Sequence, residues 1–227
     1  LLSLTFMETP NKILCISDDM FRKLVVEKDQ FLKDALKVCL PYMRGVFVKT
    51  EEQRMIFKAI YGDAYAVQLI TNEKDLPIMV MVADCIPILI FDEIKGVIAA
   101  IHAGRNSTFL KIAQITANKM INEFNCNVDN MKVIMGPSIH KCCYEVSDEL
   151  SQIVKTSFGE KFCDGRYIDL HGINIMLLEE IGIRHIRISE ICTKCSDEPF
   201  YSFRKNPQTG RFAGIISFSN NGQLNYN

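Results

Sequence analysis

The stretch LPIMVMVADCIPILIF, residues 76–91, contains two apolar runs that are separated only by Asp84 and Cys85. Runs of this length without polar alternation are typical of strands that are buried on both faces. Two shorter apolar runs, at 97–101 and 133–135, predict further buried strands. We therefore expect these segments to form the centre of the fold.

In other segments of the chain, apolar residues recur at helical spacing. This pattern predicts helices over 31–39, 110–124, 150–158 and 169–181. Ser107 or Thr108 is the expected N-cap of the second helix and Ser147 that of the third, while Gly159 and Gly182 follow the last two helices.

Two more strands are expected at 185–189, where apolar and polar residues alternate, and at 214–218. Strands and helices mix without a regular βαβ rhythm. The prediction is an α/β (α+β) fold with a mixed sheet or two sheets and flanking helices. The whole chain, 1–227, is expected to form a single domain.

The composition excludes several classes of protein. Lys and Arg number 26 against 27 Asp and Glu, so the net charge of −1 argues against a protein that binds nucleic acid through an extended basic face. No run approaches the 18 apolar residues of a membrane span, and the short apolar start at 1–7 lacks the features of a signal peptide. Nine cysteines, an odd number, do not suggest a disulfide framework. We therefore expect a cytoplasmic protein with no membrane partner.

Cys85 and His102 are the strongest candidates for chemistry. They are 17 positions apart (102 − 85) and lie at the ends of consecutive predicted strands. If these strands are neighbours, the two residues could form a zinc site or a Cys-His nucleophile pair. They could equally be a buried thiol and a histidine that is bonded to a backbone carbonyl. Asp84 lies in an apolar stretch and therefore needs a hydrogen-bonding partner.

Other candidates lie in loops. His140 could contact a ligand or be an exposed loop residue, and of the adjacent Cys142 and Cys143 one is expected in the core. Arg204 and Arg211 could bind a phosphate or a carboxylate, or could belong to a solvated basic loop. Cys192 and Cys195 form a lone Cys-x-x-Cys, with no second pair recognisable from spacing. We therefore expect neither zinc nor redox chemistry there.

Taken together and in order, several motifs resemble one family. They are Ala83-Asp-Cys-Ile-Pro, His102-Ala-Gly, Gly136-Pro-x-Ile, Cys143-Tyr-Glu-Val, Asp169-Leu, Cys192-Thr, Ser202-Phe-Arg-Lys and Thr209-Gly-Arg. In this order they resemble the YfiH family, also known as laccase-like multicopper polyphenol oxidases and peptidoglycan editing factors. The resemblance is strongest over residues 70–219.

The resemblance implies a mixed sheet with flanking helices, similar to cysteine-hydrolase-like toxin domains. It also implies a metal, usually zinc and otherwise copper, held by a His, a Cys and a second His. Cys85 matches the Cys and His102 the second His. The implied activities are phosphorolysis of adenosine, inosine and methylthioadenosine, and adenosine deamination. Precursor editing in cell-wall synthesis, copper-dependent phenol oxidation and non-catalytic binding are the alternatives.

The sequence departs from the family pattern at two places. The first His of the family has no counterpart before His102, and Glu51 near its expected position could be a third ligand or an exposed residue. In the family's His-Ala-Gly-Trp-Arg-Gly-Thr, the Trp position is Arg105 and the Arg position is Asn106, so Arg105 could restore the cation.

A nucleoside and phosphate are the expected partners of a monomer or small homo-oligomer. Asp84 and His140 are candidates for proton transfer.

Overall fold

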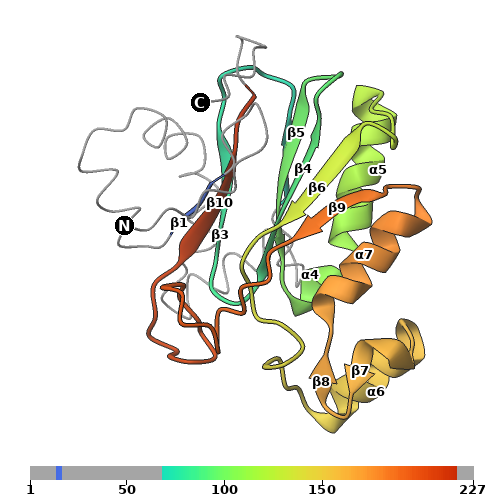
Figure 1. The fold of residues 1–227 in the computed structure, drawn as a ribbon. Coiled ribbons are helices and arrows are strands. Elements are labelled where there is room, and N and C mark those ends of the chain that lie inside the picture. Colours follow the sequence, from blue (N-terminus) through green and yellow to red (C-terminus); the bar gives the residue numbers. More distant parts are fainter. Residues whose placement is uncertain (1–13, 17–67, 219–227) are drawn as a thin grey trace, which may run out of the picture.

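The computed structural model of this 227-residue chain describes residues 14–16 and 68–218 (Figure 1). The helix predicted at 31–39 and the candidate ligand Glu51 lie outside the described residues. Within the described part, no helix is long and apolar enough to cross a membrane.

A five-stranded mixed sheet lies at the centre of the molecule. Its strands, in spatial order, are β2 (Gln68–Thr71), β5 (Val97–Ala103), β4 (Ile86–Asp92), β6 (Met131–Met135) and β9 (His185–Ile188). All neighbours are antiparallel except β6 and β9, which are parallel. The loops that follow β6 and β9 therefore leave the sheet at the same edge.

A second, three-stranded sheet packs on one face of the first (Figure 1). It contains β1 (Leu14–Ile16), β10 (Phe212–Ile216) and β3 (Ile78–Val82), all antiparallel. Gly214 of β10 allows close approach to β4, because a Cβ atom there would lie only 2.8 Å from the Cβ of Pro87.

Helices cover the other face of the five-stranded sheet (Figure 1). They are α4 (Arg105–Phe109), α5 (Ile112–Phe124) and α7 (Leu170–Glu180). Beside them lie α6 (Asp148–Ser157), the 3₁₀ turn Glu160–Phe162 and the short hairpin of β7 (Cys163–Asp164) and β8 (Tyr167–Ile168). The result is three layers, with helices, a mixed sheet and a smaller sheet. This confirms the predicted fold class.

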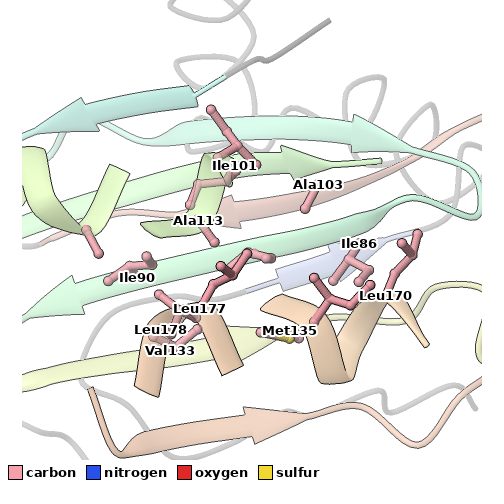
Figure 2. Close-up of a cluster of buried hydrophobic side chains, with 14 of the residues drawn as sticks. Ile86, Ile90, Ile101, Ala103, Ala113, Val133, Met135, Leu170, Leu177 and Leu178 are labelled. Carbon is pink, nitrogen blue, oxygen red and sulfur yellow. The ribbon is translucent and has the colours of Figure 1, made fainter. Parts of the chain in front are cut away.

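Alternate residues of β4 face the two layers on either side of it. Ile88 and Ile90 pack with residues of α5 and α7, and Figure 2 shows Ile90 on this side with Leu177 and Leu178 of α7. Leu89 instead packs between the two sheets. Because both faces are covered, the strand has no polar alternation, as the apolar run predicted.

Of the two predicted helix caps, one is confirmed and one is wrong. The hydroxyl of Ser147 accepts a hydrogen bond from the Leu150 amide, as predicted. The expected cap of the second helix is wrong, because Ser107 and Thr108 lie inside α4, and α5 begins after Lys111 in the left-handed conformation. The final strand begins at Phe212, two residues before the predicted start.

Candidate functional site

The candidate site lies where four strand ends meet at one end of the two sheets. β3 ends at Val82, which pairs with Phe212 at the start of β10. β4 begins at Ile86, which pairs with Ala103 at the end of β5. The short loop from β3 to β4 carries Asp84 and Cys85 into this region.

Strand register places Cys85 and His102 on the same face of the sheet. His102 pairs with Pro87, and Cys85 lies over Gly104, since a Cβ atom there would be 2.9 Å from its Sγ. Diagonal neighbours of this kind are within reach of long side chains. Ile101 and Ala103 face the helices, so His102 faces the smaller sheet.

The protein environment changes the pKa of both residues. Burial raises the pKa of the Cys85 thiol to about 11; the neighbouring Asp84 adds to the rise and Arg211 opposes it. Burial lowers the pKa of His102 to about 4, and the positive charge of Arg211 lowers it further. Arg211 thus acts on both groups, and His102 is a neutral imidazole at neutral pH.

A thiol sulfur and a neutral imidazole nitrogen are donors that zinc and copper accept. The donor chemistry of Cys85 and His102 therefore fits a metal. Among the described residues, no third His, Cys, Asp or Glu forms a ligand group with these two. A complete site would need a ligand from outside the described ranges, where Glu51 lies.

Asp84 is buried, and both of its carboxylate oxygens are engaged. Oδ1 accepts a hydrogen bond from Thr193 Oγ1 at 2.7 Å, and Oδ2 accepts one from the backbone N–H of Arg204, also at 2.7 Å. The expected partners of this carboxylate are thus present. The arrangement suits a group that holds the loop before Cys85 in place.

The candidate arginines lie near one tyrosine that the sequence reasoning did not assign a role. The Arg204 guanidinium lies 4.9 Å from the centre of the Tyr144 ring and donates a hydrogen bond to the Glu145 carbonyl at 2.7 Å. Burial raises the pKa of Tyr144, whereas Arg105 and Arg204 nearby lower it and Cys85 raises it. Tyr144 therefore lies close to Cys85 and two of the three predicted cations.

His140 belongs to a histidine pair. Its ring centre lies 4.3 Å from that of His171, and His171 Nε2 is 2.8 Å from the Ser138 hydroxyl. Among the described residues the buried Nε2 of His140 has no hydrogen-bond partner. Burial lowers the pKa of His140, against opposing effects of Asp169 and the Ser189 backbone.

The structure overturns the interpretation of two cysteine pairs. Cys142, Cys143, Cys192 and Cys195 have sulfur atoms within 4.8 Å of one another. The expectation that the Cys-x-x-Cys has no second pair is therefore wrong. Of the adjacent pair, Cys143 packs against the edge of the hydrophobic core and Cys142 is exposed. The second pair consists of adjacent residues, and this spacing does not match the Cys-x-x-Cys type of metal-binding pattern. The parallel pairing of β6 and β9 brings the following loops together.

Comparison with known proteins agrees with this fold. Residues 37–219 match the family model described as multi-copper polyphenol oxidoreductase laccase. A Clostridium acetobutylicum protein named as a purine nucleoside phosphorylase is 34% identical over 163 residues, which are 69% of this chain and 66% of that protein. Mouse purine nucleoside phosphorylase LACC1 is 32% identical over 160 residues, 66% of this chain and 37% of that protein.

Solved structures have the same architecture. YfiH of Bacillus licheniformis and YlmD of Geobacillus stearothermophilus each superpose with a TM-score of 0.62 at 28% identity, over 67% of this chain and 61% and 60% of theirs. The chain thus spans about a third to two thirds of the length of the proteins that it matches. On the extent of the family match and the shared fold, this chain belongs to the YfiH family of multi-copper polyphenol oxidoreductase laccase proteins.

Proposed function

We propose that this chain is a purine nucleoside phosphorylase that uses the site around Cys85 and His102. The substrates would be adenosine, inosine and methylthioadenosine, and adenosine deamination would occur at the same site. The observation that carries the proposal is the strand register that places Cys85 and His102 on one face of the sheet, where the charge of Arg211 lowers the pKa of both. The names of the bacterial and mouse relatives support the same substrate class.

Cys85 and His102 would hold a zinc ion, or a copper ion, together with Glu51 or another ligand from outside the described residues. When bound, such an ion supplies positive charge that polarises a nearby substrate oxygen or water. The remaining work falls to the side chains of this chain. They must bind the phosphate, place the nucleoside and handle a proton.

In phosphorolysis, a phosphate oxygen forms a bond to C1′ of the ribose while the bond from C1′ to the purine nitrogen breaks. The electron pair of that bond leaves with the purine, which must then be protonated or hydrogen-bonded. Arg211, whose Nη1 donates to the carbonyls of Thr209 and Gly210, would hold the phosphate with its remaining N–H groups, and Arg105 and Arg204 near Tyr144 would add further positive charge.

Two groups are suited to the departing base. Burial keeps the phenol of Tyr144 protonated, so that it can donate a hydrogen bond. His140 has a buried, unpartnered Nε2 that can accept or donate a proton according to its tautomer. Asp84 would serve by fixing the loop, because its two oxygens already accept hydrogen bonds.

The test is an incubation of zinc-supplemented protein with adenosine or inosine, with and without phosphate, followed by chromatography of nucleosides and bases. We expect phosphate-dependent release of adenine or hypoxanthine, and inosine wherever adenosine is deaminated. Cys85→Ala should abolish both. Cys126→Ala is the matched control, because Cys126 is buried in the core beside Asp92, at the far end of β4. Equal rates in Cys85→Ala and the unaltered protein would reject the proposal.

A further inference from the structure

Four cysteines from two distant turns meet outside the site described above. Cys142 and Cys143 lie in the turn that follows β6, and Cys192 and Cys195 lie in the turn that follows β9. All four sulfur atoms lie within 4.8 Å of one another. The first and third of these residues are 50 positions apart (192 − 142), so the cluster depends on the fold.

The backbone holds the two turns together independently of the sulfur atoms. Ser138 forms a parallel bridge with Cys192, and the Thr193 amide donates to the Ser138 carbonyl at 3.0 Å. The His140 amide donates to Cys192 Sγ at 3.5 Å. The amides of Cys195 and Lys194 hydrogen-bond the same sulfur. Amide donors of this kind stabilise a sulfur atom that carries negative charge.

The sulfur separation fits a tetrahedral metal site. Zinc–sulfur bonds of about 2.3 Å in a tetrahedron place neighbouring sulfurs about 3.8 Å apart. Cys142 Sγ and Cys195 Sγ are 3.7 Å apart, whereas a disulfide bond would need about 2.05 Å. All four residues are free cysteines. Four thiolates this close would repel one another strongly, and a divalent cation removes that repulsion.

We propose that Cys142, Cys143, Cys192 and Cys195 bind one zinc ion in a structural tetrathiolate site. Four sulfur ligands leave no open coordination position, which distinguishes the site from a catalytic one. The ion would join the turns after β6 and β9. Both turns also contact Asp84, through the Ile139 amide and the Thr193 hydroxyl. The zinc site would therefore brace the loop that carries Cys85.

The test separates this zinc from any metal at Cys85 and His102. Zinc is measured by elemental analysis in a Cys85→Ala/His102→Ala background of the full chain. We expect one zinc per chain in that background and none after Cys142→Ser and Cys195→Ser are added. Cys163→Ser is the matched control, because Cys163 donates to the Ser151 carbonyl and belongs to neither site. Absence of zinc from the background protein would overturn the proposal.

A second measurement needs no variant that might misfold. Cobalt added to the reduced, metal-free chain should give the intense visible bands of tetrahedral thiolate cobalt, and zinc should then remove them. A mercurial reagent that titrates the thiols should release zinc together with four sulfur equivalents. Two missing thiols in the unreduced, denatured protein would instead show a disulfide and contradict the zinc site. Iron found in place of zinc would overturn the choice of metal.

Discussion

Thr193 donates a hydrogen bond of 2.7 Å from its Oγ1 to Oδ1 of Asp84, which is 109 positions earlier in the chain. The other Asp84 oxygen accepts the backbone N–H of Arg204. Because Asp84 directly precedes Cys85, one buried carboxylate fastens the loop of the candidate nucleophile or ligand to two later segments. The position of Cys85 therefore depends on residues that are remote in sequence.

Thr193→Val should lower the free energy of unfolding by about 1–3 kcal/mol, because it leaves one buried carboxylate oxygen without its donor. Urea unfolding measures the change. Thr193→Ser retains the hydroxyl and is the matched control, so it should lose much less. An equal loss in the two variants would show that the methyl group, and not the hydrogen bond to Asp84, is responsible.

Gly104→Ala should displace the thiol of Cys85, since the added Cβ would lie 2.9 Å from its Sγ. A misplacement of about 1 Å at a reacting group costs roughly a hundredfold in rate. We expect a loss of that order in nucleoside phosphorolysis. Circular dichroism checks that the fold is retained. Full activity in a folded Gly104→Ala protein would show that the Cys85 sulfur need not occupy its present position.

Arg211→Gln should raise the KM for phosphate at least about tenfold, the cost of losing one charge-assisted contact. The KM for the nucleoside should change less. Arg184→Gln is the matched control. Arg184 directly precedes β9, is exposed, and donates a hydrogen bond to the Glu179 carbonyl of α7. If the KM for phosphate is the same in both variants, Arg211 does not bind the phosphate, and Arg105 and Arg204 become the candidate phosphate-binding residues.

Stability should fall as the pH drops below about 6.5 because of His171. Burial, and to a lesser extent His140, lowers the pKa of His171 from 6.5 to about 3. Between these values the unfolded chain binds a proton that the folded chain does not, so the free energy of unfolding decreases by about 1.4 kcal/mol per pH unit. At pH 4 the loss from this residue is about 3 kcal/mol.

His171→Gln removes this contribution, so its free energy of unfolding should depend less steeply on pH between 6.5 and 4. Denaturant unfolding at several pH values measures the slope. His185→Gln is the control, because it removes an imidazole that is exposed on β9. Parallel curves for the His171→Gln and unaltered proteins would contradict the assignment.

The sequence predicts those features that depend on neighbouring residues. Apolar runs locate β3, β4 and β5 because both faces of these strands are covered. Ser147 marks the start of α6 because its hydroxyl caps an amide only three residues later. The proximity of Cys85 and His102 follows from the pairing of consecutive strands.

Features that depend on long-range contacts could not be predicted in this way. The spacing of Cys142 and Cys143 matches no metal-binding pattern, and their partnership with Cys192 and Cys195 exists only because β6 and β9 are parallel neighbours. The position of Tyr144 beside Arg204 likewise arises from two distant loops. The start of α5 was misplaced because Lys111 adopts a left-handed conformation that its residue type does not favour.

The most direct test of the central claim follows the phosphate itself. Isotopically labelled inorganic phosphate is incubated with inosine and zinc-supplemented protein, and the pentose product is isolated. The account predicts labelled pentose 1-phosphate in an amount equal to the hypoxanthine released, with none formed by Cys85→Ala. Hypoxanthine release without label in the pentose, or labelling that persists in Cys85→Ala, would contradict it.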